Sequence, residues 1–464
     1  MARESGTVIG MGVPGDVPPA GPRVAIVGSG PAGFYLADYL LRSAEPRLSV
    51  DVFERLPVPF GLVRFGVAPD HQSIKRTSLV FHRTAQQPGF RFIGNVEVGS
   101  AVSVAELLAH YHAVALAYGA AHDKRLGIPG EDLRGSFAAT AFVGWYNGHP
   151  DFAERQFDLD AERAVVVGMG NVAMDVARLL VRDPDELAPT DIASYALDAL
   201  RESRVREVVL LGRRGPVQAA FDLGELIDIA QLPDVGLSVE GALPSASREP
   251  LDSTTRRLVD YVEALPRERL PGKKRQVVLR FLASPAEVVG EGDRVRALKV
   301  ENNELRERNG SASAHGTGEF EQIPTGIVVR SIGYQGSGLP GVPFDATRGV
   351  VPNAAGRVID SAATVVPGLY AVGWIKRGPT GLIGSNKSDA KETSQTMLDD
   401  AASWMGRSVS DSAELIQRLG DVHRLVGFSD FERIDAAEID RGKASGKVRE
   451  KFVSFAALLK ATEP

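Results

Sequence analysis

The stretch that decides the fold is RVAIVGSGPAG, residues 23–33. A compact apolar run stops at Gly28 and passes directly into an apolar-periodic stretch, which predicts a strand, a tight turn and a helix. Gly28 permits the turn, Gly30 lets the backbone approach a pyrophosphate, and Gly33 lets helix and strand pack closely. Unpaired N–H groups at the helix N-terminus favour the phosphates. The stretch therefore predicts a dinucleotide-binding turn.

The chain beyond this turn favours a flavin over a nicotinamide. The next predicted strand, residues 48–53, ends at Glu54, about 20 residues beyond the last glycine, where a carboxylate accepts ribose hydroxyls. Residues 57–71 then combine prolines, glycines and apolar side chains in a connection that is too hydrophobic for a solvated loop. A planar isoalloxazine would cover such a surface. A buried Ω-loop that packs against the core is the alternative.

A second unit of the same kind begins with RAVVVGMGNVAMD, residues 163–175. Gly168, Gly170 and Ala173 take the three fingerprint positions. Alanine in the third place widens the separation of helix and strand slightly but keeps the phosphate cradle. Two such units predict two nucleotide sites.

The second site favours NADP over NAD. The strand predicted at residues 207–211 is followed by Arg213 and Arg214 rather than by an acid. Paired guanidiniums bind a 2′-phosphate that an acid would repel. The arginines come later than the usual distance of about 20 residues, and a helical excursion at residues 184–203 accounts for the surplus. Glu225, further on, is a candidate for a ribose hydroxyl or for an arginine.

Two further buried strands, residues 112–121 and 326–334, indicate that the second unit is inserted into the first. The predicted fold class is α/β, with two Rossmann-like dinucleotide-binding domains and the NADP domain inserted into the FAD domain. The predicted ranges are a flexible leader at 1–22, an FAD-binding domain at 23–124 and 331–464, and an NADP-binding domain at 125–330. Within the insert we expect a charged helical stretch at 248–275 and a hairpin tip or mobile loop at 304–318.

The composition excludes several kinds of chemistry. The 464 residues contain no cysteine, which excludes disulfides, an iron-sulfur cluster held by the protein and a redox-active thiol pair. The net charge of −6 gives no global support for nucleic-acid binding. No apolar run reaches the roughly 18 residues of a membrane span. We predict no metal site, and we expect a cytoplasmic protein because no secretory signal is recognisable.

Several long strings together resemble the adrenodoxin reductase-like ferredoxin–NADP reductases, FAD enzymes that pass electrons from NADPH to small iron-sulfur proteins. The resemblance runs nearly end to end and is more specific than either glycine fingerprint. The strings are VPFGLVRFGVAPDH (58–71), FVGWYNGHP (142–150), GNVAMDVAR (170–178), GRRGP (212–216) and GWIKRGPTGLIGSNKSDA (373–390).

The resemblance implies two sets of cofactor contacts. For FAD it implies the glycine turn with Ala32, Glu54 and Leu62, Val96 near the adenine or flavin edge, and Trp374, Gly381, Leu382 and Ile383 over the isoalloxazine. For NADP(H) it implies pyrophosphate contacts from Gly170, Asn171 and Val172, a 2′-phosphate site at Arg213 and Arg214, and a ribose contact from Glu225. Many related flavin folds carry an acid directly after the glycine that precedes Trp374, and here the tryptophan replaces it.

The resemblance also brings His71 and Asp175 together near the nicotinamide site. We hypothesise a hydrogen-bonded pair that orients the site and shuttles a proton when reduced flavin is reoxidised. A purely structural pair between the domains is the alternative. The implied mechanism is hydride transfer from NADPH to the flavin, followed by two single-electron steps to the partner.

Iron-sulfur carriers of this kind are acidic, so the resemblance requires a local basic surface. A candidate surface lies within residues 256–280 and comprises Arg256, Arg257, Lys273, Lys274 and Arg275. A second basic stretch runs from Arg64 to Arg91. Either run can also be a solvated face without a partner. A monomer is the default expectation, since no coiled-coil pattern is present.

Two other functions remain open at this point. A flavin-dependent oxygenase, or a reductase subunit of a larger complex, also contains two dinucleotide domains. A nucleotide-sensing flavoprotein without turnover is the non-enzymatic alternative. Intact motifs at both sites favour a working reductase.

Overall fold

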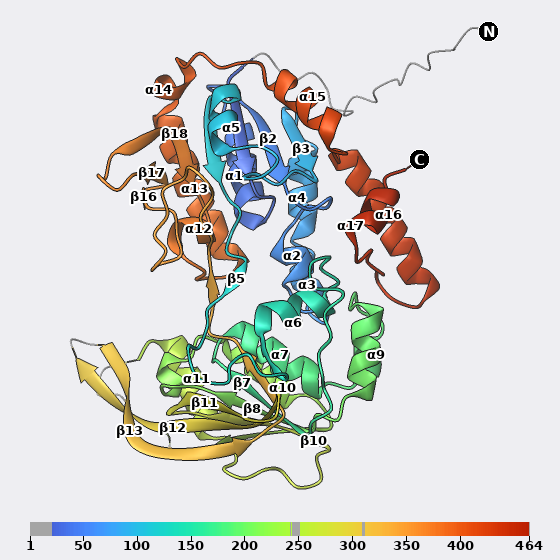
Figure 1. Ribbon diagram of the computed structural model, residues 1–464, viewed down its shortest axis with the longest axis vertical. Helices are drawn as coiled ribbons and strands as arrows, with labels where there is room; N and C mark the ends of the chain where they lie inside the picture. Colours follow the sequence, from blue (N-terminus) through green and yellow to red (C-terminus); the bar gives the residue numbers. More distant parts are fainter. Residues whose placement is uncertain (1–20, 242, 244–250, 309–310, 464) are drawn as a thin grey trace.

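The computed structural model describes residues 21–241, 243, 251–308 and 311–463 (Figure 1). Residues 1–20 of the predicted leader lie outside these ranges. Within them, no helix combines the length and the apolar character that crossing a membrane requires. The chain builds two large sheets with helices between and around them, which confirms the predicted fold class.

The first sheet has seven strands, and its five-strand core is parallel. Neighbouring residues of its central strand face opposite sides: Val24 and Ile26 join one apolar cluster, whereas Ala25 and Val27 join another. Such a strand is buried on both faces, as expected of a parallel sheet. In spatial order the strands are β16 (Asn353–Ala354), β17 (Arg357–Ile359), β18 (Val365–Ala371), β4 (Ala113–Leu116), β1 (Arg23–Val27), β2 (Ser49–Glu54) and β3 (Phe90–Gly94).

Helices cover both faces of this sheet. One apolar cluster includes residues of α1 and α13, and the other includes residues of α5 and α15. The helices that belong to this part of the chain are α1 (Pro31–Leu41), α2 (Leu62–Phe65), α3 (Gln72–Lys75), α4 (Ser78–Ala85), α5 (Val104–His110), α12 (Trp374–Arg377), α13 (Ile383–Asp399), α14 (Ala401–Met405), α15 (Ser412–Val422), α16 (Phe428–Ala444) and α17 (Phe455–Lys460).

The second sheet has six strands, all parallel. In spatial order they are β6 (Ser136–Ala138), β14 (Ile327–Arg330), β7 (Arg163–Val167), β8 (Glu207–Leu211), β10 (Arg275–Arg280) and β9 (Val235–Glu240). The helical elements of this part are α6 (Ala139–Tyr146), α7 (Asn171–Val181), α8 (Pro184–Leu187), α9 (Ser194–Glu202), η1 (Pro216–Gln218), α10 (Leu223–Ala230) and α11 (Ser253–Glu263).

A smaller antiparallel sheet covers the face of the second sheet that α7 and α10 leave open. Its strands are β11 (Ala283–Glu291), β12 (Arg294–Arg308) and β13 (Ser311–Pro324). Residues 304–318, expected as a hairpin tip or mobile loop, are therefore mostly paired strand. The charged stretch at 248–275 contains the helix α11 but is helical only over 253–263 among the described residues.

The chain passes between the two large sheets twice. It leaves the first sheet through β5 (His122–Asp123) and returns through β15 (Tyr334–Gln335), and these two short strands pair with each other. Insertion of the second domain into the first follows from this path (Figure 1). The exact domain limits at 124/125 and 330/331 stay a prediction.

Candidate functional site: a cleft between two glycine turns

A cleft of about 1830 Å³ lies between the two domains, where the carboxyl ends of both parallel sheets meet. Ligands of open α/β sheets bind outside these strand ends. A pocket for one small molecule usually measures about 300–1,000 Å³, so the volume suits two dinucleotides. Both glycine turns open into this cleft.

The first glycine turn has the geometry that its sequence predicts. Gly28 has a φ of +106°, and a Cβ there would meet the carbonyl oxygen of Ala117 at 2.7 Å. A Cβ on Gly33 would lie 2.2 Å from the carbonyl oxygen of Gly28, so this glycine lets α1 approach β1. Gly30 has nothing within 4 Å of a Cβ and leaves room for a pyrophosphate. The first turn of α1 has no side-chain cap, so its N–H groups remain available to an anion.

Glu54 lies at the end of β2 beside this turn. Its Oε2 accepts hydrogen bonds from Ser29 N (3.0 Å) and Ser29 Oγ (2.6 Å), and its Oε1 accepts one from Leu56 N (3.1 Å). A carboxylate has about four acceptor positions, so it can still accept hydroxyl groups from a ligand. Ser29 is a residue that the sequence reasoning missed, because it occupies a variable position of the fingerprint.

The segment at residues 57–71 combines both structures that its sequence allowed. Val58, Phe60 and Phe65 are buried in the core, as in a packed Ω-loop. Leu62, in contrast, is 37% exposed and lines the cleft. Part of this segment thus packs inward, and part presents an apolar surface to the cleft.

The second glycine turn repeats this design. Gly168 has a φ of +141°, and a Cβ there would meet the carbonyl oxygen of Ser331 at 2.1 Å. Gly170, like its counterpart in the first turn, has open space in front of it. Asn171 begins α7 and exchanges two hydrogen bonds with Asp222, at 3.0 and 2.9 Å. These bonds tie the phosphate-facing end of α7 to the start of α10.

Arg213 and Arg214 follow β8 at the edge of the cleft. Their carbonyl oxygens are held by Asn303 Nδ2 (2.9 Å) and by Leu282 N (3.3 Å). Within the described ranges, no carboxylate lies within 4 Å of either guanidinium. A fixed backbone with two uncommitted guanidiniums suits a phosphate.

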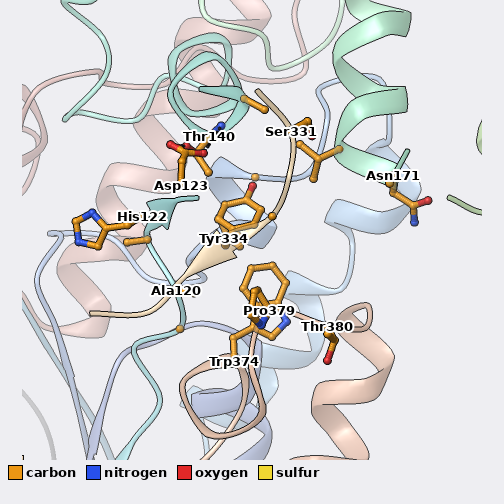
Figure 2. A pocket seen from close by; sticks show the side chains of 18 of the residues that line it. Ala120, His122, Asp123, Thr140, Asn171, Ser331, Tyr334, Trp374, Pro379 and Thr380 are labelled. Atoms are coloured by element: carbon orange, nitrogen blue, oxygen red, sulfur yellow. Dashed lines mark hydrogen bonds between the residues drawn. The ribbon is translucent and has the colours of Figure 1, made fainter. Parts of the chain in front are cut away.

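Trp374 and the start of α13 form another wall of the cleft. The centroids of the Trp374 and Tyr334 rings are 5.3 Å apart, and the buried Trp374 Nε1 has no hydrogen-bond partner among the described residues. Figure 2 shows the two rings next to each other. Leu382, 59% exposed, precedes α13, whose first turn also lacks a side-chain cap. Trp374 stands directly after Gly373, where related folds carry an acid, and Asp389 on α13 accepts a hydrogen bond from Gly373 N.

His71 faces three carboxylates across the domain boundary. Its Nδ1 lies 3.7 Å from Asp175 Oδ1, and its Nε2 lies 3.9 Å from Glu225 Oε2 and 3.7 Å from Asp228 Oδ2. These distances suit charge pairs but are too long for hydrogen bonds. The predicted hydrogen-bonded pair of His71 and Asp175 is therefore absent from this conformation.

Arg178, which the sequence reasoning missed, holds these acids instead. It is 1% exposed and donates to Asp175 (2.6 Å), Glu225 (2.7 Å) and Asp70 (2.7 Å). Burial raises the pKa of Asp175 despite this guanidinium, and burial together with the charge of Asp175 raises that of Glu225. Ligand-type atoms of His71, Asp175 and Glu225 lie within 4.8 Å of one another. The guanidinium beside them opposes a metal cation.

Most of the predicted site residues meet in this cleft. His71, Asp175 and all predicted cofactor-binding residues line it, with the exceptions of Gly33 and Ala173, which pack behind the two turns. The cofactor contacts themselves stay predictions. Asp123, Thr140 and Tyr334, at the two interdomain connections, also line the cleft and were not predicted (Figure 2).

Comparisons with known proteins agree with this geometry. A family model for an NAD(P)-binding Rossmann-like domain matches residues 26–94. NADPH-ferredoxin reductase FprA of Mycobacterium leprae (strain TN) is 44% identical over 94% of this chain and 98% of its own length. The mitochondrial NADPH:adrenodoxin oxidoreductase of Bos taurus is 43% identical over 95% of this chain and 92% of its own. The structure of Mycobacterium tuberculosis FprA in complex with NADPH matches with a TM-score of 0.86 and 42% identity, over 95% of this chain and 99% of that one.

Proposed function

The chain belongs to the adrenodoxin reductase-like family of FAD-dependent ferredoxin–NADP reductases, and from that premise we propose how its cleft carries electrons from NADPH to an iron-sulfur protein. The single observation that carries this function is one cleft that contains both glycine turns, with Glu54 beside the first and Arg213 and Arg214 beside the second. FAD bound at the first turn supplies the redox chemistry, because a flavin accepts a hydride from NADPH and releases its electrons one at a time.

The residues of the chain bind and orient the two nucleotides. Open space at Gly30 and Gly170 admits the pyrophosphates, and the uncapped helix ends stabilise their charge. Glu54 accepts the ribose hydroxyls of FAD. The orphaned Trp374 Nε1 and the apolar Leu62 and Leu382 suit the polar and apolar edges of an isoalloxazine.

We propose that His71 moves a proton at this site. It is 16% exposed, so it can exchange protons with solvent, and it faces carboxyl groups whose pKa values are raised. Burial of these carboxyls favours their neutral, protonated form. Asp175 would orient the histidine, once a modest movement brings the two side chains into hydrogen-bond distance.

Anaerobic stopped-flow mixing of the FAD-loaded protein with NADPH, and separately with NADH, tests the function. Flavin absorbance should bleach with NADPH in preference to NADH and return when oxidised ferredoxin is added. A protein without bound flavin would contradict the assignment. Bleaching that ferredoxin does not reverse would instead favour an oxygenase or a subunit of a larger complex.

For the iron-sulfur partner we propose docking at Arg256 and Arg257. Both side chains are exposed on the first turn of α11. The helix α11 links the parallel strands β9 and β10, so its first turn lies at the carboxyl edge of the sheet, where the cleft opens. This location supports a contact close to the flavin.

The other basic residues of the two predicted stretches have less support. Lys273, Lys274 and Arg275 precede or begin β10 and therefore lie at the opposite, amino edge of the sheet. Lys274 is also paired with Asp234 at 2.7 Å. In the stretch from Arg64 to Arg91, the two end residues are held by Glu438 and Asp51.

Charge-reversal variants distinguish docking at the carboxyl edge of the second sheet from docking at its amino edge. The variant Arg256→Glu/Arg257→Glu should raise the KM for ferredoxin about tenfold at low salt, because complementary charges steer the encounter. Reduction of a small dye should be unchanged. Lys273→Glu/Lys274→Glu is the matched control with the same change in net charge. Equal effects of both variants would show that only overall charge matters.

A further inference from the structure

The turn between α8 and α9 is buried, although it connects two surface helices. Thr190 is 9%, Asp191 5%, Ile192 1% and Ala193 3% exposed. This turn belongs to the helical excursion that lengthens the NADP-binding domain and that does not line the cleft. Connections normally run over the surface, so another part of the chain must cover this one.

The first part of the chain that covers this turn belongs to the FAD-binding domain. Lys75, on α3, places its Nζ 2.7 Å from Asp191 Oδ2 and 2.9 Å from Asn147 Oδ1. Gln72 Nε2, one turn earlier, lies 2.8 Å from Asp191 Oδ1. His71 is the N-cap residue of this same helix. The contact therefore positions α3, and with it the histidine that faces Asp175.

The second cover is the segment that follows α16. Lys451 places its Nζ 2.6 Å from Asp191 Oδ2 and 3.1 Å from the Asp191 carbonyl oxygen. Lys447 Nζ donates to the carbonyl oxygen of Ile192 at 2.6 Å, and Val448 N donates to that of Pro189 at 2.9 Å. In Figure 1 this red segment turns back from the lower end of α16 toward α17 and passes near one end of α9.

The segment that follows α16 is also anchored to the segment at residues 57–71. Glu438 on α16 is 0% exposed and accepts hydrogen bonds from Arg64 of α2, at 2.6 and 2.7 Å. It also accepts from Arg449 (2.9 Å) and from Phe452 N (2.9 Å). The segment at residues 447–452 thus bridges the NADP-binding excursion and the loop that faces the flavin.

Two buried lysine side chains share the one carboxylate of Asp191. Lys75 and Lys451 retain only 11% and 2% side-chain exposure. Removal of one partner from a buried polar cluster is strongly destabilising, and here one carboxylate serves both lysines. The cluster is satisfied only while the excursion, α3 and the C-terminal segment stay together.

We propose, on the premise of the reductase function above, that the Lys75–Asp191–Lys451 cluster fixes the two domains in the orientation that hydride transfer requires, with Asp191 as its positioning residue. Asp191 touches neither nucleotide-binding turn and does not line the cleft. Its effect passes through α3 and the C-terminal segment. Loss of the carboxylate removes the acceptor that both lysines share and allows the domains to separate.

The variant Asp191→Asn tests this in the FAD-loaded protein. Flavin reduction by saturating NADPH should slow by at least about tenfold, since a misplacement of about 1 Å can cost about 100-fold in rate. The FAD content and the Kd for NADP⁺ should stay close to those of the parent. Adding Lys451→Met to this variant removes one of the two lysines that have lost their acceptor and should restore part of the rate.

The control is Asp198→Asn, which changes an exposed acid of the same excursion that faces solvent. It should leave the rate unchanged. A parental rate in Asp191→Asn, or an equal loss in both variants, would overturn the proposal.

The interdomain distance gives a readout that does not need turnover. Because the chain has no cysteine, Gln86→Cys, directly after α4, and Glu202→Cys on α9 accept spin labels without competing thiols. The label distance should be narrow in the parent and broader or longer with Asp191→Asn. An unchanged distribution would refute the positioning role. If NADPH failed to reduce the parent, the reductase function would fail while this distance test remained valid.

Discussion

Arg213 and Arg214 decide which nicotinamide nucleotide the second site accepts. Their backbone is fixed and their guanidiniums have no carboxylate partner within the described part of the chain. A hydrogen bond to a charged group contributes about 1.5–3 kcal/mol, so Arg213→Ala/Arg214→Ala should raise the Kd for NADP⁺ by about 100-fold. Binding of NAD⁺ should change little, because it lacks the 2′-phosphate. Titration of the flavin spectrum with each nucleotide measures both values.

Arg201→Ala is the control for this prediction. Arg201 lies on α9 in the same domain and pairs with Asp185 and Asp198 rather than facing the cleft. Its loss should affect neither nucleotide. If the double arginine variant kept the preference for NADP⁺, the 2′-phosphate would have to be recognised elsewhere.

His71 and Asp175 are expected to control the rate of the reaction. Positioned general acids and bases contribute about 100-fold or more, so His71→Ala should slow hydride transfer or flavin reoxidation about 100-fold. Asp175→Ala should slow it less, because Arg178 keeps Glu225 and Asp70 in place. Stopped-flow rates of both variants check this. Unchanged rates would leave the pair with a structural role only.

Among the individual site residues, those that belong to a local sequence pattern could be predicted. Glu54 is found because it ends the strand after a glycine turn, and the spacing is a property of one βαβ unit. Arg178 could not be predicted as a site residue, because its partners Asp70 and Glu225 come from distant elements. The sequence of its own helix gives no sign of these contacts. Trp374 is correctly placed in the cleft, but the hydrogen bond from Gly373 N to Asp389 depends on how α13 packs.

The first glycine turn makes a prediction at the scale of the helix α1. A Cβ on Gly33 would lie 2.2 Å from a backbone oxygen of β1's turn, so Gly33→Ala must push α1 away from the sheet. Overpacking of this kind costs about 1–3 kcal/mol. We expect a lower Tm of the apoprotein and weaker FAD binding, measured by thermal unfolding and by the ratio of flavin to protein absorbance.

Gly30→Ala separates binding from folding in the same turn. Nothing lies within 4 Å of a Cβ at Gly30, so the apoprotein should keep its Tm. FAD should still bind less tightly, because the added methyl group occupies the approach to the pyrophosphate. Parental flavin content in both variants would contradict the assignment of this turn to FAD.

Elements built on local apolar periodicity were predictable, and elements that depend on distant pairing were not. β1 and β7 are short apolar runs that end at glycines, so sequence alone defines them. The pair β12 and β13 extends over residues that look like a polar loop, because its stability comes from antiparallel pairing and from packing on the second sheet. This strand pair can be recognised only once its pairing with β11 and its packing on the second sheet are known.

At the scale of the whole molecule, insertion of one domain into the other could be predicted because two strand–turn–helix units are flanked by buried strands. The contact between the domains could not. It depends on Asp191, Lys75 and Lys451, which lie far apart in the sequence and each resemble an ordinary charged surface residue. Burial turns them into a cluster, and burial is a property of the assembled chain.

This cluster gives the molecule a pH-dependent stability. Burial, together with the charges of Lys75 and Arg64, lowers the pKa of Lys451 to about 7 from its ordinary value of 10.5, against the attraction of Asp191. Burial also lowers the pKa of Lys75. These are the charged groups that face Lys451, and Arg64 is itself paired with Glu438.

The sign follows from the protons bound in each state. Between pH 7 and 9 the unfolded chain keeps the Lys451 proton while the folded protein releases it, so the free energy of unfolding should rise with pH by up to about 3 kcal/mol. Lys451→Met removes the titrating group and should make the increase smaller, while Lys460→Met, on an exposed turn of α17, should leave it unchanged. Denaturant unfolding at pH 7 and pH 9 measures the difference. A parental stability that falls over this interval, or an equal rise in Lys451→Met, would show that this lysine keeps its proton in the folded protein and that the domain contact does not respond to pH.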